Sequence, residues 1–289
     1  MKKMLMPTLL LLLTFFGLSP NSSYANDAQR IVAIDGSISE IVYALGKGHL
    51  MVGRDTTTTF PEAATKLPSV GYMRQLSAEG ILSLKPTLIL ATKDAKPQNV
   101  LSRLKKAGVH VEIIDNTYTA EGVIEKIKQI AKILNVDSAG QQLATDVQKS
   151  IADAKAVAQK VMAQSQQPTK ALFVLNMRGN NMMVAGSQTR ADTMLSLAGV
   201  VNPAAQHLNG YKPLTAEAAI QYNPDYLLTM QHGERSAGGK HEMLNTPAVK
   251  MTNAGKNKQL IIVDDNFLMF GPRMGDAIEN MARKIYAQQ

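Results

Sequence analysis

The chain contains two segments that match each other without a gap. Residues 76–92 read LSAEGILSLKPTLILAT, and residues 214–230 read LTAEAAIQYNPDYLLTM. Each has a leucine, a hydroxyl residue and an Ala-Glu pair at its start, a proline at the same later position, and an apolar run at its end. One match at a single large offset predicts two similar half-proteins rather than a solenoid of short repeats.

Each copy predicts a short helix that stops before its proline and leads into a buried strand, at residues 88–91 and 226–230. Other apolar runs of strand length alternate with helical patterns along the chain. The further strands are expected at residues 31–34, 111–114, 171–175 and 260–263, and the further helices at 99–107, 191–198 and 276–286. This alternation predicts an α/β protein with two Rossmann-like lobes, each built on a parallel sheet covered on both faces.

A long helical pattern separates the two copies. Apolar residues recur at helical spacing from Leu143 to Val161, and no proline interrupts them before Pro168. Asp137 is expected to cap this helix. We therefore predict an N-terminal lobe over residues 26–136, one interlobe helix over 137–167 and a C-terminal lobe over 168–289. A helix transmits little bending, so the lobes should keep a nearly fixed separation around a ligand cleft.

The N-terminus has the pattern of a secretory signal peptide. Lys2 and Lys3 precede an apolar run over residues 9–18, and a small-residue step ends at Ala25. The run is shorter than the ~18 residues that a membrane span needs. The sequence has no cysteine to carry a lipid or to form a disulfide or thiolate metal site. We expect residues 1–25 to be removed and the mature protein to be a periplasmic monomer without a lipid anchor.

Charge and motifs exclude several classes of function. The formal net charge of +8 falls to +6 without Lys2 and Lys3, and the basic residues are scattered, which disfavours nucleic acid as a partner and suits an anionic small ligand. The sequence lacks the Gly-x-Ser-x-Gly, phosphate-loop and His-Glu-x-x-His motifs, so we do not expect an enzyme. Its five histidines are dispersed, which disfavours a zinc or manganese receptor.

The loop sequence GYMR, residues 71–74, is the strongest candidate for ligand chemistry. It lies before the helix that Ser77 opens, and ligands of α/β lobes bind at loops beyond the carboxyl ends of strands. A tyrosinate is a hard anionic donor that can hold the iron of ferric haem, and the charge of Arg74 would favour the ionised form of Tyr72. From the residues alone, an ordinary surface tyrosine is the alternative interpretation.

Four segments together resemble the periplasmic haem-binding proteins of bacterial haem ABC importers, the HmuT/ShuT type. They are residues 34–46 (IDGSISEIVYALG), 71–91 (GYMRQLSAEGILSLKPTLILA), 210–220 (GYKPLTAEAAI) and 270–278 (FGPRMGDAI). The likeness extends through essentially the whole mature chain. Cobalamin- and siderophore-binding relatives share the two-lobed fold and the Ala-Glu helices, whereas the Gly-Tyr-x-Arg loop favours haem. Cobalamin or a ferric siderophore is the alternative ligand.

The resemblance implies a transport function. Ferric haem is the transported ligand, an inner-membrane permease and ATPase complex is the partner, and an outer-membrane haem receptor system acts upstream. The resemblance also implies that Tyr72 is the axial iron ligand, that Arg74 is its hydrogen-bonding or charge partner, and that Glu79 and Glu217 engage arginines of the permease. Without the resemblance, each glutamate is interpreted as an acid that favours the start of its helix.

The second lobe gives a less definite ligand set. Some members of the resembled group have a histidine in the loop after its first strand, but residues 176–186 here read NMRGNNMMVAG and have none, which favours a single haem. Met182 or Met183 is the alternative second axial ligand, and apolar packing is the other interpretation of both. The remaining residues predicted to contact haem are Met73 and Met269 on its apolar face, Arg178 and Arg273 on its propionates, and Tyr211 as a pocket wall.

Overall fold

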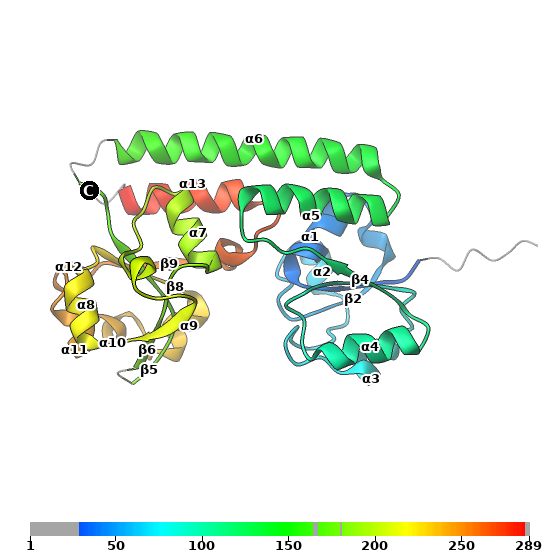
Figure 1. Cartoon of the computed structure of the whole chain (residues 1–289), viewed down its shortest axis with the longest axis horizontal. Coiled ribbons are helices and arrows are strands. Elements are labelled where there is room, and N and C mark those ends of the chain that lie inside the picture. The colour runs from blue at the N-terminus through cyan, green and yellow to red at the C-terminus, as the bar shows by residue number, and fades with distance from the viewer. Residues whose placement is uncertain (1–28, 164–166, 180, 287–289) are drawn as a thin grey trace, which may run out of the picture.

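The computed structural model describes residues 29–163, 167–179 and 181–286 and has two α/β lobes below one long helix (Figure 1). The predicted signal peptide, residues 1–25, lies outside the described residues. Within the described ranges, none of the helices combines the length and apolarity needed to span a lipid bilayer.

The N-terminal lobe is built on a four-stranded parallel sheet with the order β2-β1-β3-β4. Its two central strands are fully buried, as expected for a parallel sheet covered on both faces. The strands are β1 (Ile31–Ile34), β2 (Met51–Arg54), β3 (Leu88–Thr92) and β4 (His110–Ile114). The helices are α1 (Gly36–Ala44), η1 (Gly48–Leu50), α2 (Glu62–Thr65), α3 (Ala78–Leu82), α4 (Gln98–Lys106) and α5 (Ala120–Ile133).

The C-terminal lobe has a five-stranded mixed sheet with the order β7-β6-β5-β8-β9. The β5, β8 and β9 strands run parallel, and β6 and β7 continue the sheet in antiparallel pairing. The strands are β5 (Ala171–Arg178), β6 (Asn181–Ala185), β7 (Tyr211–Leu214), β8 (Tyr226–Met230) and β9 (Leu260–Val263). The two-lobed α/β prediction is confirmed, but the antiparallel part differs from the expected parallel sheet. Because β6 begins so soon after β5, no crossover helix fits between them.

The helices of the C-terminal lobe are mostly short. Among the described residues of this lobe, only α7 and α13 have eight residues or more. The helices are α7 (Arg190–Leu197), η2 (Pro203–Gln206), α8 (Ala216–Tyr222), α9 (Gln231–Ser236), α10 (Lys240–Asn245), α11 (Pro247–Lys250), α12 (Asn253–Lys256), η3 (Asp265–Leu268) and α13 (Met274–Tyr286).

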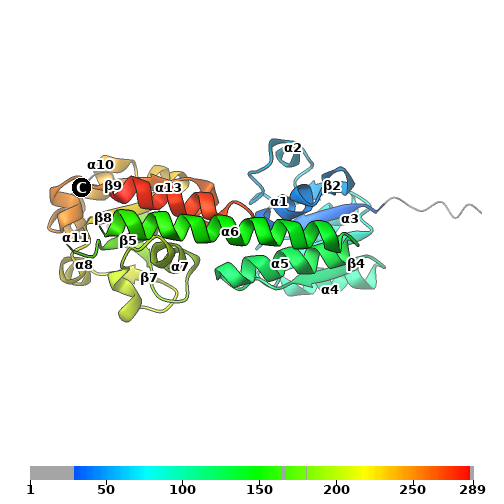
Figure 2. The ribbon, with the colours of Figure 1, turned by 90° about the horizontal axis from the view of Figure 1, so that it is seen from above.

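The helix α6 (Asp137–Met162) lies across both lobes. Seen from above, α5 runs beside it over the N-terminal lobe and α13 runs on its other side over the C-terminal lobe (Figure 2). The helix begins where predicted, although Val136 rather than Asp137 occupies the N-cap, and Asp137 instead places an acid in the positively polarised first turn. Residues 164–166 of the predicted helix lie outside the described residues.

Two glycines allow the neighbouring helices to approach α6 closely. A Cβ atom at Gly140 would lie 2.2 Å from the Cβ of Ala131 in α5, and one at Gly275 in α13 would lie 2.1 Å from the Oγ of Ser150 in α6. Real Cβ atoms are essentially never found so close to another heavy atom. The absence of a side chain at these two helix crossings therefore sets how closely α6 packs against α5 of the N-terminal lobe and α13 of the C-terminal lobe.

One hydrophobic core links the lobes. It joins Ile31 and Leu88 of the first sheet, Phe173 and Leu228 of the second, and Ile151 of α6 in a single cluster of buried side chains. The opposite face of each sheet has a separate core of its own. Both sheets are thus covered on both faces, and the face nearest α6 is shared.

Replacing Gly140 by Ala should destabilise the protein. The added methyl group meets a side chain that cannot move without its backbone, so we expect the free energy of unfolding in urea to fall by about 1–3 kcal/mol, as for other overpacked cores. Gly80→Ala in α3 is the matched control, because its new Cβ would lie 3.9 Å from its nearest neighbour. Equal stability of the two variants would show that the α5–α6 contact is not tight.

Candidate functional site between the lobes

The loop that carries Tyr72 and Arg74 exposes both side chains. Tyr72 is 42 % exposed, which is high for a large aromatic residue, and Arg74 is exposed beside it. Gly71 has a φ of 89°, a left-handed conformation that favours glycine. The loop then turns back on itself through a 2.7 Å hydrogen bond from the Gln75 N–H to the Tyr72 carbonyl. The phenol of Tyr72 is therefore accessible to a ligand.

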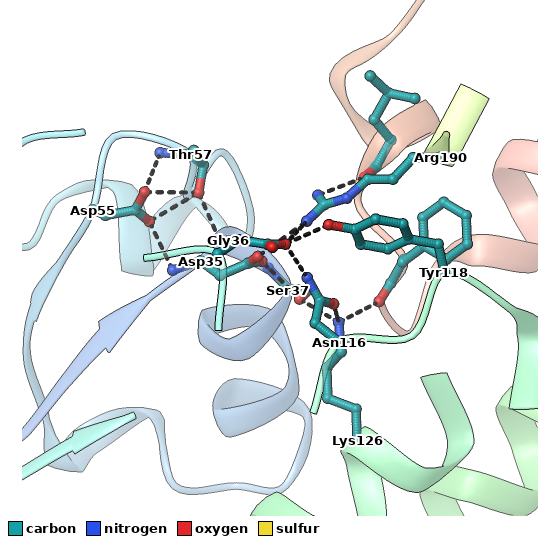
Figure 3. Close-up of polar contacts among 12 residues, drawn as sticks. Asp35, Gly36, Ser37, Asp55, Thr57, Asn116, Tyr118, Lys126 and Arg190 are labelled. Atoms are coloured by element: carbon teal, nitrogen blue, oxygen red, sulfur yellow. Dashed lines mark hydrogen bonds and ion pairs between the residues drawn. The ribbon is translucent and has the colours of Figure 1, made fainter. Parts of the chain in front are cut away.

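Polar residues follow the carboxyl ends of all four strands of the N-terminal sheet. Asp35 follows β1, Asp55 follows β2, Asp94 lies just beyond β3, and Asn116 lies just beyond β4. The carboxyl ends of parallel strands meet at one edge of a sheet, which is where open α/β sheets bind ligands. Here this edge faces the second lobe, because Arg190 reaches it from α7 (Figure 3).

Arg190 makes the central contact between the lobes. Its Nη2 lies 3.4 Å from Asp94 Oδ2 and 3.6 Å from Asp35 Oδ2, and its Nη1 donates to the Leu268 carbonyl at 3.1 Å. The guanidinium carbon lies 4.6 Å from the centroid of the Tyr118 ring, a cation–π arrangement. The Tyr118 hydroxyl and the Asn116 amide both donate to Asp94 Oδ2.

Lys126 of α5 makes a second buried contact between the lobes. Its ammonium group donates to Asn116 Oδ1 at 2.6 Å, to Ser37 Oγ at 2.9 Å and to the Phe270 carbonyl of the C-terminal lobe at 3.2 Å. Ser37 in turn donates to Asp35, the residue that caps α1. Lys126 thus extends the Arg190 contacts into one network, shown in close-up in Figure 3.

Burial and charge shift the pKa values within the network. Burial lowers the pKa of Lys126 to about 8, against the opposing charge of Asp35. Burial alone would raise the pKa of Asp94, but hydrogen bonds from Tyr118 and Asn116 and the charge of Arg190 bring it below its ordinary value. Asp94 is therefore held as a carboxylate that pairs with the C-terminal lobe.

Tyr211 and Arg74 approach this network from opposite lobes. Tyr211 begins β7, an edge strand of the C-terminal sheet. Burial raises the pKa of Tyr211 to about 12, although the charges of Arg190 and Arg74 act to lower it. Arg74 also acts on the pKa of Asp94. Arg74 of the first lobe is therefore close enough to Tyr211 of the second for its charge to act on the phenol.

Arg273 has an ionic partner in the structure. Its Nε and Nη2 donate to the two carboxylate oxygens of Glu40 at 3.0 and 3.1 Å, and its guanidinium lies 4.0 Å from the centroid of the Phe60 ring. Glu40 is buried in α1, so this bidentate pair is another contact between the lobes. The arginine predicted to meet a propionate is engaged with the N-terminal lobe instead.

The methionines predicted at the ligand divide into two groups. Met73 and Met182 are buried in the separate cores of the first and second lobes, where they pack as apolar side chains rather than line an accessible site. Met183 and Met269 are partly exposed, and the sulfur of Met269 lies close to Gly36 at the start of α1. Arg178, at the end of β5, is exposed. Met183, Met269 and Arg178 stay predictions.

The network itself was not predicted from the sequence. A usable signal was present in Asp35 and Asp55, which directly follow two apolar strands, because polar residues at that position indicate the ligand edge of a parallel sheet. The two basic residues gave weaker signals. Lys126 lies on the apolar face of α5 next to Ile127, and nothing local distinguishes Arg190 from any other residue in the first turn of a helix.

Across the described ranges, the structure has no cluster of three or more His, Asp or Glu side chains placed to hold a metal ion. A groove of about 390 Å³ lies elsewhere, between α5 and α6, where Ile124 and Ile151 line it together with charged residues.

Comparisons with known sequences agree with the two-lobed arrangement. A family model described as "Periplasmic binding protein" matches residues 31–267. The uncharacterized ABC transporter substrate-binding lipoprotein YvrC of Bacillus subtilis (strain 168) is 28 % identical over 263 residues, which cover 90 % of this chain and 81 % of that protein. A vitamin B12-binding protein of Yersinia pestis (strain Pestoides F) is 35 % identical over 94 residues, covering 32 % of this chain and 34 % of its own.

Solved structures extend the similarity to haem-binding proteins. The periplasmic heme-binding protein RhuT from Roseiflexus sp. RS-1, in apo form, superposes with a TM-score of 0.85 and is 36 % identical. The periplasmic heme-binding protein BhuT, in complex with two hemes, superposes with a TM-score of 0.85 and is 38 % identical. Each alignment covers 90 % of this chain and 98 % of the other. The predicted resemblance to this group is confirmed.

Replacing Arg190 by Met should destabilise the protein strongly at neutral pH. The change leaves Asp35 and Asp94 without their cationic partner, and breaking a buried pair in this way typically costs about 3–5 kcal/mol. Because the pKa of Asp94 is lowered in the folded protein, the stability that it contributes is present above the ordinary Asp pKa and is lost as the pH falls through the folded value.

The stability difference between wild type and Arg190→Met should therefore be largest at neutral pH and should narrow in acid. Urea unfolding at a series of pH values measures it. Arg178→Met is the matched control, because Arg178 is exposed and its loss should change the free energy of unfolding by about 0.5 kcal/mol or less. An equal effect of both substitutions would contradict the role of Arg190.

Proposed function

Because the chain belongs to the periplasmic binding protein family, whose model spans most of both lobes, we propose that it captures ferric haem in the periplasm and delivers it to an inner-membrane ABC importer. The observation that carries the choice of haem is the exposed Tyr72 beside Arg74, together with the likeness to haem-binding proteins of known structure. The function is binding and delivery, with no catalytic step.

Tyr72 is proposed to hold the haem iron. A phenolate binds ferric iron through a hard anionic oxygen, and the side chain of Tyr72 is exposed where a ligand can reach it. Tyr211, on the opposite lobe, is a poor competitor for the metal, because burial raises its pKa to about 12. We propose that Tyr211 forms a wall of the site instead.

The rest of the haem would meet a mixed surface. Arg74 and Arg178 are exposed cations that can bind propionate groups, and Met183 and Met269 offer flexible, partly exposed apolar side chains. Arg273 would join them only by leaving Glu40, which would unpair a buried carboxylate. We therefore assign Arg273 to holding the lobes together rather than to the ligand.

Cobalamin is a second candidate ligand. The observation that favours it is the sequence match to vitamin B12-binding proteins, which extends over part or most of the chain. Cobalamin brings its own cobalt ligands, so the binding of cobalamin would not depend on the Tyr72 oxygen. Parallel titrations with hemin and with cyanocobalamin distinguish the two ligands, and preference for cyanocobalamin would overturn the haem proposal.

Replacing Tyr72 by Phe should change the spectrum of bound hemin. The variant keeps the aromatic ring but lacks the oxygen donor, so we expect loss of the iron–phenolate absorption and an affinity lower by roughly tenfold or more, about 1.4 kcal/mol. Absorption titration with hemin measures both, and its end point gives the number of haems, which the sequence predicts to be one.

Tyr211→Phe is the matched control for this titration. It also removes only a phenol oxygen, and it should leave the iron spectrum unchanged, because Tyr211 is assigned to the wall. An unchanged spectrum of Tyr72→Phe, or a spectrum lost only in Tyr211→Phe, would show that Tyr72 is not the iron ligand.

Glu79 and Glu217 are proposed to dock the protein on its transporter. Both are exposed in the first turns of α3 and α8, one on each lobe. Substrate-binding proteins of ABC importers work with a membrane permease and its ATPase, and an acid on each lobe can meet a cation on each half of such a partner. Charge complementarity of this kind mainly raises the rate of encounter and fixes orientation.

The Glu79→Lys/Glu217→Lys variant should bind hemin normally but fail to deliver it. Reversing both charges repels a basic partner, while neither side chain contributes to the core. Haem uptake and ATPase stimulation by the transporter reconstituted in liposomes measure the loss. Uptake equal to that of wild type would show that the two glutamates do not dock the transporter and only favour the starts of their helices.

A further inference from the structure

Each docking glutamate has an exposed aliphatic neighbour on the same helix. Leu82, at the end of α3, is 38 % exposed, and Ile220, in α8, is 48 % exposed. Each follows its glutamate by three residues, and residues three apart on a helix are neighbours on its surface. Both lobes therefore present a carboxylate and a branched aliphatic side chain side by side.

The two pairs occupy equivalent positions in equivalent units of structure. Ser77 and Thr215 cap α3 and α8 by accepting the N–H three residues later. Lys85 and Asn223 both take left-handed conformations, with φ of 47° and 39°, directly before a proline. The strand that follows each helix pairs in parallel with the first strand of its lobe. The sequence repeat is thus also a structural repeat.

The surroundings of the aliphatic residues differ between the lobes. The position after the glutamate is Gly80 in α3 and Ala218 in α8, and the position after the aliphatic residue is Ser83 in one and Gln221 in the other. Single exposed apolar residues are common on protein surfaces and need no explanation. A large aliphatic residue that recurs beside a carboxylate, where its neighbours have diverged, is a more specific feature.

We propose that each Glu–aliphatic pair is a two-point contact for one half of a two-fold membrane partner, which offers a cation next to an apolar hollow on each half. This inference rests on the proposed delivery function. The partner is a protein surface rather than a lipid surface, because a carboxylate beside each aliphatic residue is repelled by anionic headgroups. Glu79 and Leu82 would meet one half of it, and Glu217 and Ile220 the other.

The two members of each pair have different tasks. An exposed carboxylate steers the encounter, and its effect weakens as salt screens the charges. A buried aliphatic side chain loses its contact with water only once the complex has formed, so it slows dissociation and is insensitive to salt. Neither α3 nor α8 is near α6: they lie in separate lobes on the parts away from it (Figure 1).

The test uses the Leu82→Ser/Ile220→Ser variant and the permease–ATPase complex of the same transport system in nanodiscs. We expect an unchanged hemin spectrum and association rate, and a dissociation rate raised roughly tenfold, since differences within one interface lie mainly in dissociation. The ratio of the variant's dissociation rate to that of wild type should be the same at about 50 mM and about 300 mM salt, although charges are screened much more strongly at the higher concentration. Glu79→Lys/Glu217→Lys should instead slow association, most at low salt.

Ile113→Ser/Met251→Ser is the matched control. It also removes one exposed apolar side chain from each lobe, at 38 % and 57 % exposure, and it should dissociate like wild type. The inference is overturned if the Leu82/Ile220 variant dissociates like wild type, if the control is equally affected, or if wild type binds protein-free anionic vesicles through these residues. Failure of wild type to bind hemin contradicts the proposed function, whereas normal hemin binding with unaltered dissociation contradicts only the two-point contact.

Discussion

The ion pairs of Arg190 with Asp35 and Asp94 determine how the two lobes meet. They join the first turn of a helix in one lobe to the carboxyl ends of parallel strands in the other. A buried charge is tolerated only with its partners in place, so these contacts form together or not at all. Lys126 and the Arg273–Glu40 pair add further contacts across the same junction. With α6 seated on both lobes, only small movements about this junction keep every charge paired.

This junction also determines what is left for a ligand. Asp94 is engaged by Arg190, Tyr118 and Asn116, and Glu40 by Arg273, so neither of these two carboxylates is left unpaired toward the space between the lobes. Arg74 keeps an exposed guanidinium at the border of that space, and Tyr72 keeps an exposed phenol. A site whose walls are already held in place loses little conformational freedom on binding, which favours affinity for a rigid planar ligand.

Local sequence patterns predicted most helices and strands of the fold. The features that were not predicted depend on contacts between residues far apart in the sequence. The repeat at Glu79 and Glu217 fixed the two lobes, because its caps, helices and strands depend on neighbouring residues. The antiparallel strands β6 and β7 were not predicted, because β7 contains Lys212 and Pro213 and only its pairing with β6 makes this segment a strand. The burial of Met73 and Met182 in the separate cores was also not predicted, because tertiary packing decides which face of a strand or loop a methionine occupies. The pairing of Arg273 with Glu40 spans most of the chain and leaves no local trace.

The hydrophobic core shared beneath α6 means that the two repeated lobes are not independent folding units. Although the lobes repeat one design, their sheets bury one face in the same cluster, with Ile151 of α6 packed among residues of both. Separating the halves would expose that face in each, at a cost that neither smaller core could offset. The protein should consequently unfold as a single cooperative unit, in which a destabilised strand of one lobe lowers the melting temperature of the other. Each half has the outline of an independent domain but lacks the means to fold alone.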